Sequence, residues 1–407
     1  MNSIPFLSDD AIPGGFLFSA ARAGLKASGR TDFAGIVADK GTSAAAMFTA
    51  NRIIAAPLIV DKIHLSRTAG HVRVVAINAG NANCATGEAG LAAARRVCGA
   101  VAATFGCHEY EVFPASTGII GVPLPAENLI AALPQLQSSL GRSAEHLYQL
   151  ALAIMTTDTR EKVSATTLEI AGKTVRILAV GKGSGMIHPQ LVPHATMLVY
   201  VLTDAQVEPA ALLGFLQSAV NVSFNRISVD GDTSTNDTVL LLASGSSGAG
   251  IDAASAPAFQ QALTQVCTSL AKQIVADGEG ITHVVELEIE GAPSDADAIK
   301  VAKAIAHSPL VKTAWAGCDP NWGRLLSATG ASGVAIDPAK INLWFGELEI
   351  CRNGERSPLY DEAKAHEYLK QREYRIRMSL RVGTGSCRFW TTDLTTEYVR
   401  INADYST

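Results

Sequence analysis

The sequence has little of what marks membrane, secreted or nucleic-acid-binding proteins. Charged residues make up 17% of its 407 residues and the formal net charge is −5, so no basic surface for nucleic acid or for an anionic membrane is predicted. No apolar run approaches the roughly 18 residues that a membrane-spanning helix needs. The first ten residues include no basic residue, which argues against a signal peptide. We therefore expect a cytoplasmic protein.

Cysteine is scarce and its spacing is uninformative. There are seven cysteines, an odd number, and no two of them form a CxxC pair. A disulfide framework or a structural zinc site is therefore not expected. We expect reduced, mostly buried thiols and no metal site. The cysteines are Cys84, Cys98, Cys107, Cys267, Cys318, Cys351 and Cys387.

Hydrophobic residues are plentiful, at 48% of the chain, and their patterns alternate between strand and helix. A short β-branched run covers 72–79, and 166–180 is typical of a hairpin turning at 171–173. A further strand is predicted over 196–203. In the last third of the chain, long strand-like runs follow at 341–350, 374–382 and 387–402. Helices are predicted over 88–105, 143–155, 208–220, 258–276 and 294–307. We therefore predict a layered α/β fold with mixed sheets.

Two polar segments mimic known binding loops without matching them. The glycine-rich segment 181–185 lacks the Walker A pattern, because Arg176 stands where the first glycine belongs and Gly183 follows Lys182. It lacks the dinucleotide pattern as well, since Met186 replaces a glycine. We interpret it as a flexible loop that brings Lys182 to a site. Segment 230–237 resembles a calcium loop, but Leu241 stands where the glutamate belongs, which indicates a hydrogen-bonded polar loop.

Other residues are open to two interpretations. Thr117 and Gly118 follow a predicted strand and would suit an oxyanion hole, although these residues alone favour a plain turn. Glu279 lies between two glycines at the end of a predicted helix. Its carboxylate could bind a substrate ammonium, or it could belong to a solvated loop that caps the helix. His188 and His194 have no evident third metal ligand, and His194 is a candidate general base.

The Ala195-Thr196 bond is the most informative point in the chain. A threonine in mid-chain is chemically ordinary. If the chain were cut before Thr196, the new α-amino group could serve as the base for the threonine hydroxyl. The cut would produce two pieces, 1–195 and 196–407.

Taken together, these segments resemble the ornithine acetyltransferase family of arginine biosynthesis, also called the glutamate N-acetyltransferase family. The resemblance extends over nearly the whole chain. Between Ile187 and Ala195 lie seven residues, more than the family pattern has. The landmarks are 48–52, 78–83, 116–118, 155–159, 182–187, 195–198, 224–226, 229–237, 277–280, 319–324 and 401–405.

The resemblance implies self-cleavage between Ala195 and Thr196, with Thr196 as nucleophile and with Thr117 and Gly118 as the oxyanion hole. It implies substrate binding by Thr156, Lys182, Thr196, Glu279, Asn402 and Thr407. The implied α chain is 1–195, carrying the oxyanion-hole loop and the Lys182 loop, and the implied β chain is 196–407.

The reaction that the resemblance implies is acetyl transfer from N2-acetylornithine to glutamate by a ping-pong mechanism. No cofactor is implied, and use of acetyl-CoA as a co-substrate stays open. The implied fold is that of the DmpA-type aminopeptidases, and the implied assembly is a heterotetramer of two α and two β chains. The alternatives are an aminopeptidase or amidohydrolase of that type, and an uncleaved scaffold without activity.

Overall fold

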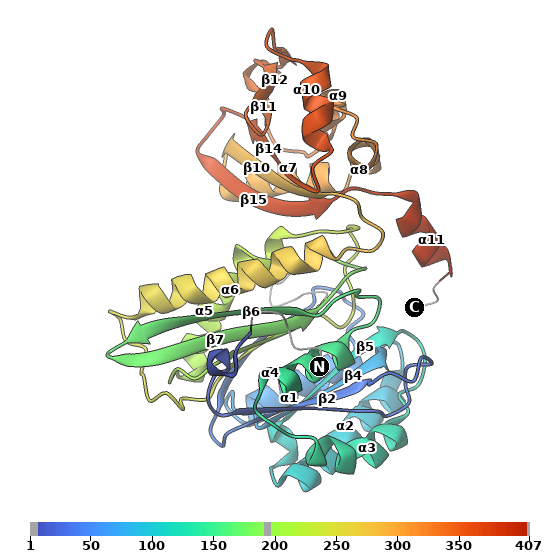
Figure 1. Ribbon diagram of the computed structural model, residues 1–407, viewed down its shortest axis with the longest axis vertical. Coiled ribbons are helices and arrows are strands. Elements are labelled where there is room, and N and C mark those ends of the chain that lie inside the picture. Colours follow the sequence, from blue (N-terminus) through green and yellow to red (C-terminus); the bar gives the residue numbers. More distant parts are fainter. Residues whose placement is uncertain (1–6, 191–196, 405–407) are drawn as a thin grey trace.

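The computed structural model describes residues 7–190 and 197–404. Within these residues, three mixed sheets and their helices build two lobes (Figure 1). The larger lobe holds a four-stranded and a five-stranded sheet, and the smaller lobe is built from the C-terminal six-stranded sheet. The predicted α/β class with mixed sheets is thereby confirmed.

The five-stranded sheet is the centre of the larger lobe. Its order is β3-β9-β8-β7-β6, with β8 and β9 parallel and the other pairs antiparallel. Every residue of β8 and β9 is buried, as expected for strands that are covered on both faces. The strands are β3 (Ser43–Phe48), β6 (Lys162–Ile170), β7 (Lys173–Lys182), β8 (Leu198–Thr203) and β9 (Thr238–Ala243).

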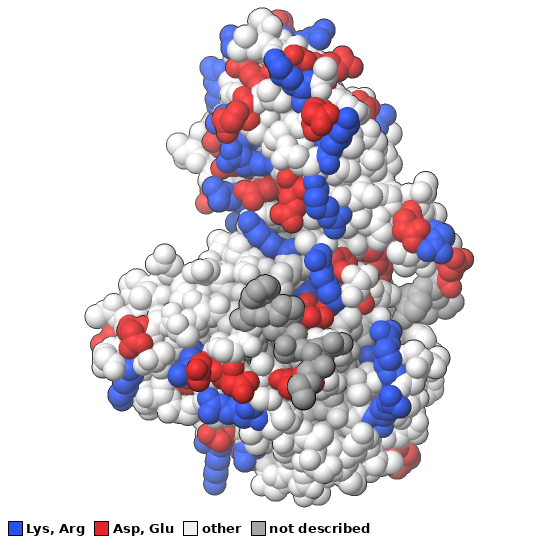
Figure 2. Space-filling view, viewed as in Figure 1, with Lys and Arg blue, Asp and Glu red and all other residues white. Residues whose placement is uncertain are grey.

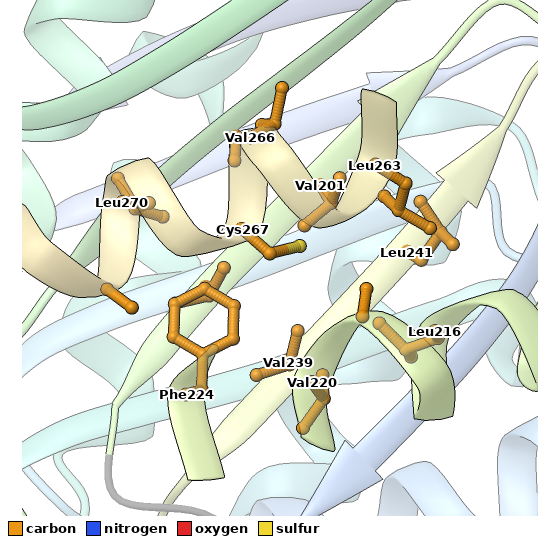
Figure 3. Close-up of a cluster of buried hydrophobic side chains, with 14 of the residues drawn as sticks. Val201, Leu216, Val220, Phe224, Val239, Leu241, Leu263, Val266, Cys267 and Leu270 are labelled. Carbon is orange, nitrogen blue, oxygen red and sulfur yellow. The ribbon is translucent and has the colours of Figure 1, made fainter. Parts of the chain in front are cut away.

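One face of this sheet packs against α5 (Pro209–Asn221) and α6 (Ala256–Ala276). Alternate residues of β8 and β9, such as Val201 and Leu241, point to these helices (Figure 3). Their neighbours Tyr200 and Leu240 belong to the core on the opposite face. The period of two along each strand therefore divides the side chains between two hydrophobic cores.

The four-stranded sheet faces the five-stranded sheet across that second core, to which α1 and α4 also contribute. Its order is β1-β2-β4-β5, and only β4 and β5 run parallel. Its other face is covered by α2 and α3. The elements are β1 (Phe16–Ala21), β2 (Phe33–Ala38), α1 (Ala56–Arg67), β4 (Val74–Asn81), α2 (Gly87–Phe105), β5 (Val112–Ile119), α3 (Ala126–Ser138) and α4 (Ala144–Ile154).

The C-terminal lobe has its own hydrophobic core beneath a sheet of order β13-β12-β11-β14-β10-β15. From its last strand, α11 (Thr396–Asp404) returns toward the larger lobe (Figure 1). The other elements are β10 (Val284–Ala292), α7 (Asp295–Ala306), α8 (Pro309–Ala316), α9 (Trp322–Gly330), β11 (Asn342–Phe345), β12 (Leu348–Arg352), β13 (Glu355–Arg356), α10 (Glu362–Leu369), β14 (Glu373–Ser379) and β15 (Gly385–Thr392).

Local signals placed several elements correctly. The Ser143 and Ser294 side chains accept backbone N–H groups at the starts of α4 and α7, and Gly106 ends α2 at a φ of 66°. The hairpin of β6 and β7 turns at Ala171 and Gly172, both with positive φ, as a two-residue turn requires. Among the described residues, no helix is long and apolar enough to cross a membrane.

Two predicted strands are wrong in detail. The run 341–350 is a hairpin of β11 and β12, because Gly346, at a φ of 57°, reverses the chain. The run 387–402 contains β15 and then the helix α11. Apolar and β-branched residues in 387–402 favour a strand locally, but tertiary contacts decide where that strand ends.

Candidate active site

Six of the eight predicted binding and catalytic residues line one cavity of about 110 Å³. These six are Thr117, Gly118, Thr156, Lys182, Glu279 and Asn402. Met197, the first described residue after the predicted nucleophile, lines the same cavity. His194, Ala195, Thr196 and Thr407 lie outside the described residues.

Thr117 and Gly118 reach the cavity from the end of β5, and not from a turn after a strand as predicted. Gly118 has a φ of 131°, and a Cβ there would lie 2.4 Å from the carbonyl carbon of Gly80 on β4. A side chain at this position would therefore collide with the neighbouring strand. Close approach of the two strands holds the Thr117-Gly118 segment at the cavity wall.

Buried amides hold this end of β5 in place. The Asn236 side chain donates to the carbonyl oxygens of Ala82, at 2.6 Å, and Ser116, at 2.8 Å. The Ser116 hydroxyl in turn donates to the Asn78 side chain at 2.6 Å. Because these groups are buried, each needs its partner. The network therefore fixes the position of Thr117 relative to β4 and to the polar loop before β9.

Lys182 is the last residue of β7. The prediction of a flexible loop over 181–185 is therefore wrong for Gly181 and Lys182, which belong to this strand. Its ammonium donates to the Thr156 hydroxyl at 2.7 Å and to the Thr117 hydroxyl at 3.2 Å. An ammonium only donates, so the Thr117 oxygen accepts and its own proton is available for another acceptor. Burial lowers the pKa of Lys182, although Asp158 opposes the shift.

A buried ion network lies behind Lys182. The Lys162 ammonium bridges the carboxylates of Asp158 and Asp277, with both N–O distances 2.6 Å. Asp158 also lies 3.9 Å from the Lys182 ammonium and accepts the Gly183 N–H at 2.7 Å. Burial alone would raise the pKa of Asp158, but Lys182 and Lys162 hold it well below its usual range. The two cations and two anions thus balance within the protein interior.

Glu279 reaches the cavity from the segment that follows α6, as predicted. One of its carboxylate oxygens accepts the Asn402 side chain of α11 at 2.9 Å. A Cβ on Gly185 would lie 2.3 Å from the Glu279 carboxyl carbon, and one on Gly280, which has a φ of 65°, would lie 2.5 Å from the Tyr398 amide. These glycines allow the carboxylate and α11 to pack closely at the cavity.

The 230–237 segment is a hydrogen-bonded polar loop, as predicted. The Asp230 carboxylate accepts the N–H groups of Met186 at 2.7 Å and Ile187 at 2.9 Å. Met186 has a φ of 55°, a backbone conformation that residues other than glycine rarely adopt. Burial raises the pKa of Asp230 to about 6. This carboxylate therefore holds the backbone that leads from Lys182 toward the predicted cleavage site.

His188 is buried against His307, with ring centroids 4.2 Å apart. Burial lowers the pKa of His188 to about 3 and that of His307 to about 4. Both rings are therefore neutral at pH 7, which suits a packing role. Among residues 7–190 and 197–404, no three His, Cys, Asp or Glu side chains form a group that could hold a metal ion.

Sequence reasoning assigned no role to Asp158, Lys162, Asp230, Asn236 or Asp277. Asp158 and Asp277 lie within resemblance landmarks, and Asp230 and Asn236 lie within the polar loop, so their positions were noticed. Lys162 carried no such signal, because a lysine at the start of a strand is usually solvated. Only the contact with two carboxylates 4 and 115 residues away reveals its role.

Comparison with known proteins adds independent findings. The ArgJ family model matches residues 17–407. An arginine biosynthesis bifunctional protein ArgJ from Geobacter sulfurreducens is 43% identical over 396 residues, which is 97% of this chain and 99% of the relative. The protein of that name from Methylococcus capsulatus is 44% identical over 97% of this chain and 95% of its own.

One solved structure is similar in sequence over half of the chain. It is the arginine biosynthesis bifunctional protein ArgJ of Bacillus halodurans, 42% identical, with a TM-score of 0.49. The match covers 51% of this chain and 98% of that one.

Proposed function

The chain belongs to the ArgJ family and is an acyltransferase of arginine biosynthesis, and we propose that the cavity described above transfers acetyl from N2-acetylornithine to glutamate. The observation that carries the assignment of the cavity is its lining. Thr117 and Gly118 from β5, Lys182 from β7 and Glu279 from the segment after α6 are three separate parts of the chain, and they line one cavity together with Met197. The cavity is also smaller than the roughly 300–1,000 Å³ of pockets for drug-sized ligands, which favours an amino-acid substrate.

In the proposed reaction, the chain is cut between Ala195 and Thr196, and the Thr196 hydroxyl attacks the acetyl carbonyl. The C–O bond of an acetyl-threonine ester forms and the amide bond breaks. The Thr196 amine takes the hydroxyl proton and returns it to the leaving α-amine of ornithine. Glutamate then attacks the ester with its α-amine, which yields N-acetylglutamate and frees Thr196.

The described residues support the stabilising roles in this scheme. Thr117 accepts from Lys182, so its hydroxyl proton can point at the developing oxyanion, together with the Gly118 amide. The Lys182 ammonium uses two of its three hydrogens on Thr117 and Thr156, which leaves one for the α-carboxylate that both substrates share. Glu279, held by Asn402, is the proposed partner of the ornithine side-chain ammonium.

We also propose that the processed protein assembles from two α chains, 1–195, and two β chains, 196–407, and that it works in the cytoplasm. No cofactor is needed for this scheme, and acetyl-CoA is a candidate second donor. The aminopeptidase alternative is not favoured, because the family model and the relatives described above are arginine-biosynthesis proteins.

The test is acetyl transfer from N2-acetylornithine to glutamate by purified variants. We expect Thr196→Ala to abolish transfer and to leave one uncut band on a denaturing gel. Thr117→Val should lower kcat by roughly 10²–10³, as loss of one oxyanion donor does elsewhere. Thr166→Val, on the outer strand β6, is the matched control and should keep full activity. Transfer by Thr196→Ala, or release of free acetate in place of acetylglutamate, would contradict the proposal.

A further inference from the structure

A second cluster of reactive side chains lies in the C-terminal lobe, and none of its members lines the cavity described above. Cys318 follows α8, His283 precedes β10, and Asp393 follows β15. The Cys318 Sγ lies 3.8 Å from His283 Nε2. On the other side of the ring, His283 Nδ1 lies 3.2 Å from Asp393 Oδ2. A thiol, an imidazole and a carboxylate are thus aligned in the order that activates a nucleophile.

The carboxylate in this cluster is held rigidly. Asp393 is buried, and it accepts the backbone N–H of Thr282 at 3.0 Å and that of His283 at 3.1 Å. It also accepts the Thr282 hydroxyl. The Thr282 oxygen also lies 2.9 Å from His283 Nδ1. Because the Thr282 hydroxyl donates to Asp393 and a carboxylate accepts only, both neighbours of Nδ1 are acceptors, which assigns the proton of the neutral ring to Nδ1. The lone pair of Nε2 therefore faces the thiol.

The thiol is accessible. Cys318 is partly exposed, and it is one of two such cysteines in the chain, the other being Cys107; the remaining five are buried. Cys318 also has a φ of 51°, just beyond the end of α8, so its backbone turns sharply out of the helix. Burial raises the pKa of the Cys318 thiol, so the sulfur is protonated at neutral pH. Because the thiolate is the nucleophile, such a thiol needs a base to take its proton as it reacts.

We propose that Cys318 is a modification site, at which His283 and Asp393 activate the thiol for exchange with small-molecule disulfides. In the exchange, the Cys318 sulfur attacks one sulfur of the disulfide and a new S–S bond forms. The S–S bond of the reagent breaks, and one half leaves as a thiolate. The thiol proton passes to His283 Nε2 and then to the leaving thiolate. Protein thiol plus disulfide thus gives a mixed disulfide plus a small thiol.

Cys107 is the matched internal control. It is partly exposed like Cys318, and burial raises its pKa to about 11. It has no imidazole contact comparable to the 3.8 Å contact between Cys318 and His283 among the described residues. The comparison of the two thiols in one protein therefore isolates the contribution of His283 and Asp393.

The test treats the full-length protein with dithiodipyridine and follows each cysteine by peptide mass mapping. General-base assistance contributes roughly 10²–10⁴-fold in enzyme sites, so we expect Cys318 to react at least about tenfold faster than Cys107 at neutral pH. His283→Gln keeps a donor to Asp393 but cannot take a proton, and should reduce the Cys318 rate to that of Cys107. An unchanged Cys107 rate in this variant reports an intact fold.

A pH series on the unsubstituted protein gives a second measurement that does not depend on how the variant folds. Proton transfer to His283 assists only the protonated Cys318 thiol, whereas the thiolate reaction of both cysteines accelerates as the pH rises. The ratio of the two rates should therefore shrink as pH rises. Equal rates at neutral pH, a constant ratio, or a fast Cys318 in His283→Gln would each overturn the proposal and leave His283 and Asp393 as a structural clamp. Neither readout requires acetyl transfer.

Discussion

Two groups of ion pairs in this protein have the same chemistry and opposite surroundings. Behind the cavity, Lys162, Asp158 and Asp277 have side chains that are 3% exposed or less. On the C-terminal sheet, arginines and glutamates pair across β10, β14 and β15, with arginine side chains 33–61% exposed. Figure 2 shows such charges of both signs intermingled over the C-terminal lobe. The buried group lies directly behind Lys182 and holds it in place, whereas the exposed pairs lie away from the cavity.

The physical reason is the cost of removing charge from water. Exposed pairs are screened and each contributes about 1 kcal/mol or less. A buried pair loses hydration on both partners, so it persists only when its geometry is good, and removal of one partner leaves an uncompensated charge. The buried network therefore needs every member, whereas the surface pairs are individually dispensable.

Replacement of Lys162 should have the largest effect. In Lys162→Met the carboxylates of Asp158 and Asp277 stay buried without their shared cation. We expect the free energy of unfolding to fall by about 3–5 kcal/mol, measured by chemical denaturation. Lys272→Met is the control, because Lys272 forms a half-exposed pair with Glu286. A loss for Lys162→Met no greater than that for the control would remove the distinction between the two groups.

His188 tests a buried titratable group that stays neutral. Its pKa is lowered to about 3, so between pH 6.5 and 3 the unfolded chain binds a proton that the folded chain does not. Its contribution to stability is complete above pH 6.5 and is lost as the pH falls. We expect about 2 kcal/mol of loss from this residue between pH 7 and 5. His188→Phe should lack this part of the acid dependence; identical pH slopes would refute the prediction.

Asp158 links the buried network to the proposed chemistry. Its negative charge is the main contribution that opposes the lowering of the Lys182 pKa by burial. In Asp158→Asn the pKa of Lys182 should fall further, so less ammonium is present for a substrate carboxylate as the pH rises. We expect the rise of KM for N2-acetylornithine with pH to begin at a lower pH in this variant and to amount to about tenfold for each unit by which the pH exceeds the Lys182 pKa, with a smaller change in kcat. A KM with unaltered pH dependence would argue against the carboxylate role of Lys182.

An exposed arginine should have the smallest effect. Arg388 lies 3.8 Å from Glu286 and 3.6 Å from Glu288, and its side chain is 61% exposed. We expect Arg388→Met to change the free energy of unfolding by about 0.5 kcal/mol, and by less in high salt. Denaturation at two salt concentrations measures this. A loss of several kcal/mol would show that exposure does not govern these pairs.

Prediction from sequence succeeded where a local signal was strong. Serine caps, a terminal glycine and the hairpin turn located α4, α7, α2 and the pair β6–β7. It failed at 341–350, where a glycine reversal was overlooked, and at 387–402, where a strand continues into α11. Resemblance supplied the candidate site residues, and the six of them that the structure describes line one cavity. Their roles in the reaction stay predictions.

The sequence by itself determined the α/β class, the main helices and six of the cavity-lining residues, because periodicity, capping signals and family motifs are all found within short segments. Only the tertiary structure decided how Lys182 is supported. Its hydroxyl partners are Thr117 and Thr156, and the network behind it joins Lys162 to Asp277, which is 115 residues away along the chain. Buried charges select partners by position in space, and no pattern along the chain encodes that choice.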